Sequence, residues 1–566
     1  SISMKLSEKF FKKISTILFW WTLIVITGPN FVLSFTENMP IAGRLANVLL
    51  PLGCWGYCLC LSRNVGRSVL LMFPLMFFGA FQIVLLHLYG RSVIAVDMFL
   101  NVVTTNAAEV GELLGNMAFA IGIVVIMYLP PIIAAICLCV EKVRIPESTI
   151  SRCRKPFFLT AIAGLCCIVA AYSGRQGYAV ENDLFPVNAL YNVGLAVDRS
   201  VKSESISNEG YRYHAISDSS HKGREVYVLI VGETSRADHW QLNGYGRKTN
   251  AELPDSVFIS YSKVLSESNT THKSVPMLLS HLSSETFGDS IYHVKSIITA
   301  FKEAGFRTAF FSNQRYNHSF IDRFGFEADT AVFIKEAPDA PANPNDLALL
   351  PLLENEINQG YDRQLIVLHT YGSHFSYKDR YEGMNPMFTP DYPVQARKSL
   401  RKELINAYDN SICVTSKLIA DVAGMLEKDN VPAAILYTAD HGEDIFDDYR
   451  DLFLHASPVP SVYQIHVPMV IWFNNCYRQR YPDICETALS NRNANISSSK
   501  AYAQTALQMA GIRTTTSDTT QSVLSKGYKE PARVYLSDHN KSVRLRRAGM
   551  DDIDFEVLRS YGISED

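Results

Sequence analysis

The sequence predicts two parts of different class: a bundle of membrane-spanning helices, then an α/β domain with a mostly parallel sheet flanked by helices. Three observations lead to this. Nearly all long apolar runs lie in roughly the first 175 residues. Later residues alternate short Val- and Ile-rich runs with helical patterns. A chain of 566 residues is also too long to fold around a single hydrophobic core. The net charge of −3 gives no electrostatic reason to expect a nucleic-acid partner.

Five apolar segments are long enough for a bilayer, which takes about 20 residues. They are Ile14–Phe35, Leu45–Leu61, Val69–Tyr89, Met117–Val140 and Phe157–Tyr172. Lys and Arg gather on one set of loops, which places the N-terminus in the cytoplasm. Five spans then put the rest of the chain outside, in the periplasm of a bacterium with two membranes. We expect a multi-pass inner-membrane protein divided into a transmembrane domain (1–173), a linker (174–221) and a catalytic domain (222–566).

Two segments near the membrane have distinct patterns. The exterior loop at about 91–115 contains a helical stretch, Ala95–Leu114, on which Asn101, Thr105 and Glu109 share one face because they are four residues apart. This face is either a solvated stripe or part of a binding site. The linker carries an apolar patch around Leu184–Val193 that suits a helix on the membrane surface.

The catalytic domain reads as alternating strands and helices. The predicted strands are Val226–Val231, Arg307–Ser312, Gln364–Thr370, Ala433–Ala439 and Val467–Phe473. The predicted helices are Ser274–His281, Ser296–Ala304, Leu400–Leu426 and Ser499–Ala510.

Polar side chains follow two of these strands. Glu233 comes one glycine after the first strand, and Asp440 and His441 come directly after the fourth. Because ligands bind at the carboxyl ends of strands in open α/β sheets, these groups are expected to meet there. His374 follows the third strand, and His455 lies a short distance beyond His441. Carboxylate oxygens with imidazole nitrogens suit zinc.

A group for the metal to activate stands in the loop Asn269–Pro276, which runs into a helix. Free backbone amides and the helix dipole at such a start can hold a phosphate. A threonine there, with its hydroxyl on zinc, would ionise near neutral pH and act as a nucleophile. The pattern does not choose between Thr270 and Thr271, and either residue or Ser274 could instead cap the helix.

Long motifs resemble those of bacterial phosphoethanolamine transferases, a family that includes lipid A-modifying and mobilised colistin-resistance enzymes. The stretches that carry the resemblance are Gly232–His239, Leu242–Tyr245, Arg247–Thr249, Thr271 with Ser274–Pro276, Gly372–His374, Asn406–Asn410, Asp440–Glu443 and His455. The spans and the linker match as well, so the resemblance is essentially chain-wide. It implies the fold of the alkaline phosphatase and sulfatase superfamily.

The resemblance also implies residue roles. Thr271 would be the nucleophile, and Glu233, Thr271, Asp440 and His441 would hold one zinc ion. His374 and His455 would bind the phosphorylated intermediate or a second zinc. Asn101, Thr105 and Glu109 would contact the ethanolamine head group of the lipid donor.

This chain also departs from the family. Glu267 and Met277 stand where lipid A enzymes commonly have a disulfide that flanks the nucleophile loop. Gln314 and His318 stand where relatives often have an Asn and a Lys near the phosphate, so these two are substrate-binding candidates that leave the acceptor open.

The resulting hypothesis is a zinc-dependent transfer of phosphoethanolamine from phosphatidylethanolamine, through a phosphothreonine intermediate, by a membrane-bound monomer. The acceptor would be lipid A, the lipopolysaccharide core or another envelope glycan. One alternative is a phosphoglycerol transferase of the same superfamily. A sulfatase-like hydrolase is the other, although Ser274-Val275-Pro276-Met277-Leu278 lacks the arginine that a sulfatase motif needs.

Overall fold

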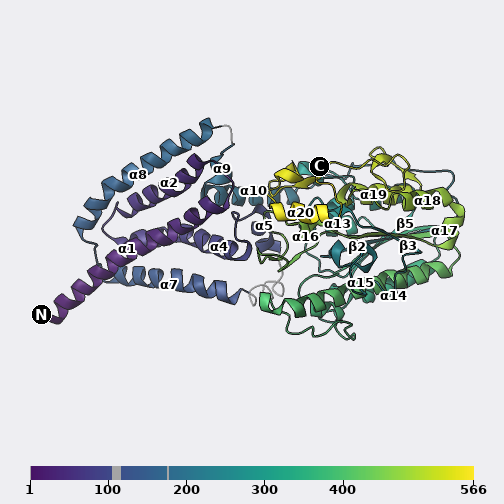
Figure 1. The fold of residues 1–566 in the computed structure, drawn as a ribbon, viewed down its shortest axis with the longest axis horizontal. Coiled ribbons are helices and arrows are strands. Elements are labelled where there is room, and N and C mark those ends of the chain that lie inside the picture. The colour runs from purple at the N-terminus through teal and green to yellow at the C-terminus, as the bar shows by residue number, and fades with distance from the viewer. Residues whose placement is uncertain (1, 105–116, 175–176) are drawn as a thin grey trace. The chain divides into compact units, whose positions relative to one another are not determined.

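The computed structural model describes residues 2–104, 117–174 and 177–566, and it divides into two compact units that meet between Ser200 and Val201 (Figure 1). The first unit is helical. The second unit holds a seven-stranded sheet with helices on both faces.

The described part of the first unit contains four long apolar helices and a bent pair of shorter ones. The long helices are α1 (Ile2–Thr36), α2 (Ile41–Leu59), α7 (Ala118–Val140) and α8 (Glu147–Ser173), and the pair is α3 (Val65–Leu71) with α4 (Phe73–Tyr89). Among the described residues, α1, α7 and α8 are long and apolar enough to cross a membrane. The pair α3 and α4, bent by 60°, makes a fourth candidate. Three or four of the five predicted spans are therefore matched by described helices of sufficient length and apolar character. Arg44 and Asn47 in the first turns of α2 lower the apolar character of the remaining segment.

Helix α2 nevertheless packs tightly along α8. A Cβ atom on Gly53 would lie 2.2 Å from the Ala161 backbone nitrogen, and one on Gly164 would lie 2.4 Å from that of Leu50. Small residues at both contacts let the two backbones approach, which is how helices associate in lipid.

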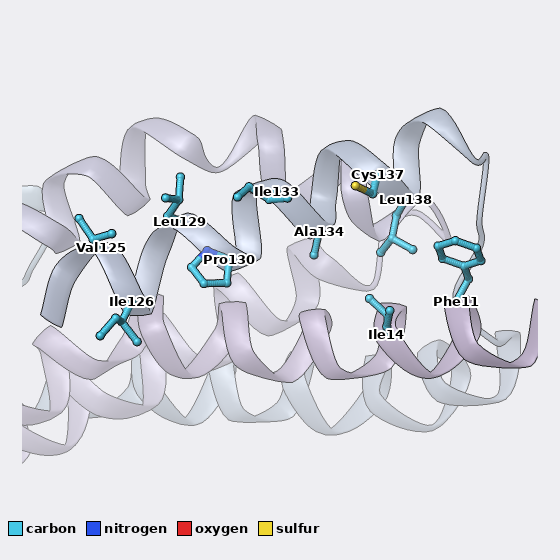
Figure 2. Close-up of a pocket in the computed structure, with 10 residues that line it drawn as sticks. All are labelled: Phe11, Ile14, Val125, Ile126, Leu129, Pro130, Ile133, Ala134, Cys137 and Leu138. Carbon is cyan, nitrogen blue, oxygen red and sulfur yellow. The ribbon is translucent and has the colours of Figure 1, made fainter. Parts of the chain in front are cut away.

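A groove of about 500 Å³ lies between α1 and α7, and every residue that lines it is apolar (Figure 2). Phe11 and Ile14 of α1 face Ile126, Pro130 and Ala134 of α7 across it. Its lining carries no charged side chain, and its one heteroatom-bearing side chain is the thiol of Cys137.

Helix α5 spans Val96–Thr104 and matches the start of the predicted helix Ala95–Leu114, of which residues 105–114 lie outside the described residues. Asn101 lies on α5, and the predicted positions Thr105 and Glu109 fall outside the described residues.

The linker folds into two helices, α9 (Val180–Asp183) and α10 (Val187–Glu204). Two buried amides fix this segment to the spans: Asn30 Nδ2 donates to the Phe185 carbonyl over 2.6 Å, and Asn47 Nδ2 donates to the Asp183 carbonyl over 2.6 Å. The segment is thus part of the helical unit at least as far as Phe185.

The sheet of the second unit has the order β3-β11-β8-β2-β7-β5-β6. Its strands are β2 (Glu225–Gly232), β3 (Phe258–Tyr261), β5 (Arg307–Ser312), β6 (Thr330–Phe333), β7 (Arg363–His369), β8 (Ala433–Ala439) and β11 (Met469–Phe473). Strand β11 runs antiparallel to both neighbours, and all other pairs are parallel. The sheet is therefore mixed through one reversed strand, and β3 and β6 are edge strands that the sequence pattern did not predict.

Helices cover both faces of this sheet because alternate residues of each strand point to opposite sides. Leu229 and Val231 pack in one core with α11 (Thr271–Leu278), α12 (Ile297–Glu303) and α19 (Ser498–Met509). Val228 and Ile230 pack in the other core with α14 (Leu350–Asn358) and α15 (Arg401–Lys428). All eight residues of β2 are buried, as expected for a central parallel strand.

Shorter elements complete the unit. The strands are β1 (Ile216–Ser217), β4 (Val264–Leu265), β9 (Asp444–Ile445), β10 (Phe453–Leu454), β12 (Ile496–Ser497), β13 (Ile512–Arg513), β14 (Val534–Leu536) and β15 (Ser542–Arg544). The helices are α13 (Phe320–Gly325), α16 (Val462–Ile465), α17 (Asn475–Arg480), α18 (Pro482–Ser490) and α20 (Asp552–Ser560).

Candidate active site

The ends of three central strands meet at one edge of the sheet. Gly232 of β2 lies opposite Ala439 of β8, and Val231 lies opposite His369 of β7. The next residue of β2 is Glu233 and the next of β8 is Asp440, so the register alone makes them neighbours. The Thr234 amide donates to Asp440 Oδ1 over 3.0 Å, which fixes the two strand ends together.

Glu233, Asp440 and His441 form a buried cluster whose ligand atoms all lie within 4.8 Å of one another. His441 Nε2 is 3.3 Å from Glu233 Oε1 and 3.3 Å from Asp440 Oδ2. On the other side of the ring, His441 Nδ1 donates to the Gly442 carbonyl over 2.8 Å, so Nε2 is the atom turned to the cluster.

The cluster fits a cation. Asp440 Oδ2 is buried and accepts no hydrogen bond from any described residue, an arrangement that costs free energy unless something positive lies beside it. Burial and the charge of Glu233 raise the pKa of Asp440 to about 8. Burial disfavours a charged His441, yet Asp440 and Glu233 raise its pKa to about 9. Burial disfavours an ionised Glu233, yet its hydrogen bond with His441 and the charge of that ring lower its pKa well below the usual value. Asp440 and His441 thus keep protons that a divalent metal would displace, and the metal would satisfy all three side chains.

Thr271 completes the cluster. Its hydroxyl lies 3.2 Å from both carboxylate oxygens of Glu233 and 3.1 Å from His441 Nε2. Helix α11 begins at Thr271, three residues before the predicted start, with Thr270 as the N-cap. The Thr270 hydroxyl lies 3.2 Å from that of Ser268 instead. Of the two threonines that the pattern left open, the geometry places Thr271 in the cluster.

The helix that carries Thr271 is tied to the strand that carries Asp440. The Ser274 hydroxyl, on the first turn of α11, donates to the Asp440 carbonyl over 2.6 Å. Ser274 therefore couples the nucleophile candidate to the metal candidates, and it does not cap the helix.

Two histidines lie beside the cluster. The His455 ring is 4.1 Å from the His441 ring and 5.9 Å from the His374 ring, measured between centroids. His455 Nδ1 contacts Glu443 Oε2 at 3.0 Å, and Tyr377 donates to the other oxygen of Glu443. Glu443 lies within the matched stretch Asp440–Glu443, where the sequence predicts no role for it. The structure makes it the group that orients His455.

The two substrate candidates of the neighbouring loop separate. Gln314 Nε2 donates to Glu233 Oε2 over 3.1 Å and to the Thr370 carbonyl over 2.8 Å, so Gln314 touches the cluster. His318 is exposed, and its ring packs 4.3 Å from that of Tyr316.

The backbone around Glu233 is strained or closely packed. Thr234 has a φ of 53°, which a β-branched residue rarely adopts. Gly372 has a φ of 52°, and a Cβ atom there would lie 2.4 Å from the Glu233 carbonyl oxygen. Asp346 holds this turn by accepting the amides of Tyr371 and Gly372, each over 2.8 Å. Asp346 was not predicted from the sequence because it ends the Pro- and Asp-rich stretch Ala337–Asp346, which contains no recognisable motif.

The family model described as Sulfatase matches residues 225–512, which is the sheet with its surrounding helices. The chain belongs to the sulfatase family. The chain is 30% identical to phosphoethanolamine transferase EptA of Escherichia coli (strain K12) over 269 residues, covering 46% of the chain and 48% of that protein. It is 27% identical to phosphatidylethanolamine transferase Mcr-2 of Escherichia coli over 502 residues, 84% of the chain and 90% of that protein. The predicted resemblance is thus confirmed, although the chain spans about half the length of the first relatives that it matches.

Two solved structures resemble this chain in fold. The integral membrane protein lipooligosaccharide phosphoethanolamine transferase A (EptA) of Neisseria meningitidis covers 90% of the chain and 98% of its own, with a TM-score of 0.71 and 21% identity. The C-terminal periplasmic domain of EcEptC from Escherichia coli, solved in complex with Zn, covers 58% and 94%, with a TM-score of 0.51 and 21% identity. A helical membrane unit followed by an α/β unit is therefore an arrangement with a solved counterpart.

Proposed function

We propose that this chain transfers phosphoethanolamine from phosphatidylethanolamine to lipid A, the lipopolysaccharide core or another envelope glycan, through a phosphothreonine intermediate on Thr271. The observation that carries the proposal is the hydroxyl of Thr271, which lies within 3.2 Å of Glu233 and His441 at the start of a helix. Relatives named phosphoethanolamine and phosphatidylethanolamine transferases support the reaction class.

Glu233, Thr271, Asp440 and His441 would hold one zinc ion, and His374 with His455 could join in a second site. When bound, zinc lowers the pKa of a coordinated hydroxyl and neutralises charge on phosphoryl oxygens. Thr271 Oγ1 gives up its proton and attacks phosphorus, and the phosphorus–oxygen bond to diacylglycerol breaks. His374 or His455 supplies the one proton that the departing oxygen takes up, which balances the proton lost by Thr271. The acceptor hydroxyl then gives up its proton and attacks phosphorus, the bond to Thr271 Oγ1 breaks, and Thr271 recovers a proton.

The amide-rich start of α11 would stabilise the charge that builds on the phosphoryl group. Gln314 donates to Glu233, and it would keep that carboxylate turned toward Thr271. Asn101, Thr105 and Glu109 remain candidates for the ethanolamine head group.

We further propose a monomer in a bacterial inner membrane with the sulfatase domain in the periplasm. Helix α2, packed along α8 through Gly53 and Gly164, would be a fifth span beside the four candidates. A membrane unit suits this reaction because the donor is a lipid, and so are several of the candidate acceptors.

One assay separates the candidate functions. Purified full-length protein is mixed with fluorescent phosphatidylethanolamine, fluorescent phosphatidylglycerol or an aryl sulfate, and products are followed by chromatography. We expect diacylglycerol from phosphatidylethanolamine alone, and a mass increase of one phosphoethanolamine on Thr271. Release from phosphatidylglycerol alone would favour a phosphoglycerol transferase, and aryl sulfate cleavage would favour a hydrolase. The Thr271→Ala variant should lose the adduct and the turnover.

A further inference from the structure

One buried amide connects the three segments that bring Thr271, His441 and His455 together. Asn269 stands two residues before Thr271, and only 3% of its surface is exposed. Its Nδ2 donates to the Ser457 carbonyl over 2.8 Å and to Gln464 Oε1 over 2.7 Å, and its Oδ1 accepts from the Tyr535 hydroxyl over 2.7 Å. Both amide hydrogens and the oxygen are thus used.

Each partner of Asn269 leads to another part of the site. Ser457 lies two residues after His455, so the bond to its carbonyl holds the loop that carries this ring. Gln464 accepts the Gly442 amide on its backbone carbonyl over 2.8 Å, and Gly442 directly follows His441. Gly442 has no room to shift, because a Cβ atom there would lie 2.2 Å from the Tyr463 carbonyl oxygen.

Gln464 is itself fixed from the far side. It is fully buried, and its Nε2 donates to Asp444 Oδ2 over 2.5 Å and to the Ser457 hydroxyl over 2.9 Å. The Ser461 hydroxyl donates to the other oxygen of Asp444 over 2.6 Å. Asp444 belongs to β9, which pairs with β10 immediately before His455. The hydrogen bonds of this network therefore form a closed ring, and Asn269 is its member closest to Thr271 in sequence.

We propose that Asn269 is a positioning residue of the proposed transfer: by binding Ser457, Gln464 and Tyr535 together, its amide sets the Thr271 hydroxyl against His441 and His455. It touches neither the phosphoryl group nor a metal ligand. A misplacement of about 1 Å at a reacting group can lower a rate about a hundredfold, so a group that fixes loop spacing can control turnover without binding substrate. This inference rests on the proposed function.

Asn269→Asp tests the inference, because it keeps the side-chain size and the acceptor for Tyr535 and removes both donors. Asn474→Asp is the matched control. Asn474 is 1% exposed, and its Nδ2 donates to the Leu426 and Val431 carbonyls over 3.1 and 2.6 Å. Its Oδ1 accepts the amide of Ala433, at the start of β8 and hence at the opposite end from Asp440. Both variants thus lose two buried donors, and only one lies at the site.

We expect Asn269→Asp to lower kcat for diacylglycerol release about a hundredfold with KM changed less than threefold, while Asn474→Asp keeps kcat and loses a similar amount of thermal stability. Tyr535→Phe, which removes one bond to Asn269, should show the same kcat effect in smaller measure and stays measurable if Asn269→Asp does not fold. Unchanged kcat in Asn269→Asp or Tyr535→Phe, or an equal loss in Asn474→Asp, would overturn the inference.

Hydrolysis of bis-p-nitrophenyl phosphate by the same variants separates this inference from the proposed function. This soluble diester reports phosphoryl transfer at the site without a lipid donor. A wild type that cleaves the diester and releases no diacylglycerol contradicts the proposed donor, and the ranking of the variants on the diester still decides the role of Asn269.

Discussion

At the scale of single residues, Asp440 gives the clearest indication of a bound cation. Its Oδ2 is buried and has no hydrogen-bond donor among the described residues. We expect Zn²⁺ at a hundred times its dissociation constant to stabilise the wild type by about 2.7 kcal/mol. Asp440→Asn should lose that gain because an amide is a poor zinc ligand. Thermal melts with Zn²⁺ and with chelator measure it, and Asp483→Asn, an exposed carboxylate of α18, is the control. A full zinc response in Asp440→Asn would contradict the assignment.

Gln314 offers a second test at this scale, because its amide is bonded to a carboxylate of the cluster. A hydrogen bond to a charged group is worth about 1.5–3 kcal/mol, so Gln314→Ala should reduce kcat/KM by about ten- to a hundredfold. Steady-state kinetics on phosphatidylethanolamine provides the measurement. Gln359→Ala, at the exposed end of α14, should behave as wild type. If both variants match the wild type, Gln314 has no part in orienting Glu233.

Most of the candidate site could be predicted from the types of residue that follow the strands in the sequence. Glu233, Asp440 and His441 could be named because a buried strand that stops at a polar residue has one place to put it. Thr271 could be chosen as the nucleophile only through the family resemblance, because its loop contains two adjacent threonines. In the structure the two differ, because α11 begins at Thr271 and Thr270 is its N-cap. Glu443 and Asp346 act through other residues, as supports for His455 and for the Tyr371–Gly372 turn. Their partners are far away in sequence, so no local pattern could indicate them.

At the scale of elements, helix α10 presents an apolar stripe to its surroundings: Val187, Leu190, Tyr191 and Val197 are between 38 and 57% exposed and recur at helical spacing. Because α10 follows a membrane-spanning candidate and is held by Asn30 and Asn47, we expect this stripe to contact lipid head groups. Leu190→Asp should slow transfer in vesicles by several-fold and leave hydrolysis of a soluble diester unchanged. Leu190→Ala is the matched control, and equal vesicle activity of Leu190→Asp and Leu190→Ala would refute lipid contact by the stripe.

Strong patterns gave reliable elements. Strands β2, β5, β7 and β8 were predicted within one residue of each end, because continuous apolar runs, rich in Val, Ile and Leu in β2 and β7, occur where both faces of a sheet are covered. The edge strands β3 and β6 were missed, since each has four residues and β6 is only half-buried. The predicted span Leu45–Leu61 corresponds to α2, which is not among the described helices that are both long and apolar enough to cross a membrane. Asn47 lies inside this run and Arg44 directly precedes it, and both lower the mean hydropathy of the helix.

At the scale of the whole molecule, we expect one unit to contain the complete metal site and the other to give access to the lipid donor, and this can be tested. Glu233, Thr271, Asp440 and His441 all belong to the unit Val201–Asp566, which also contains the whole sheet and both of its cores. A fragment of residues 201–566 should therefore fold and bind Zn²⁺ as tightly as the full chain, which isothermal titration would show. Zinc affinity at least tenfold weaker in a folded fragment would mean that the helical unit completes the metal site.

The same fragment should behave differently toward lipids. It lacks the helices that would hold it at a bilayer and the α5 region proposed to meet the ethanolamine head group. We expect hydrolysis of a soluble phosphodiester to stay within about threefold of the full chain, because the site's geometry is set inside one unit. Transfer from phosphatidylethanolamine in vesicles should fall by about two orders of magnitude or more. The fragment is no longer anchored in the bilayer that contains its lipid donor, so the effective concentration of the donor at the site is lower. Equal losses in both assays would place catalytic groups, and not only lipid access, in the helical unit.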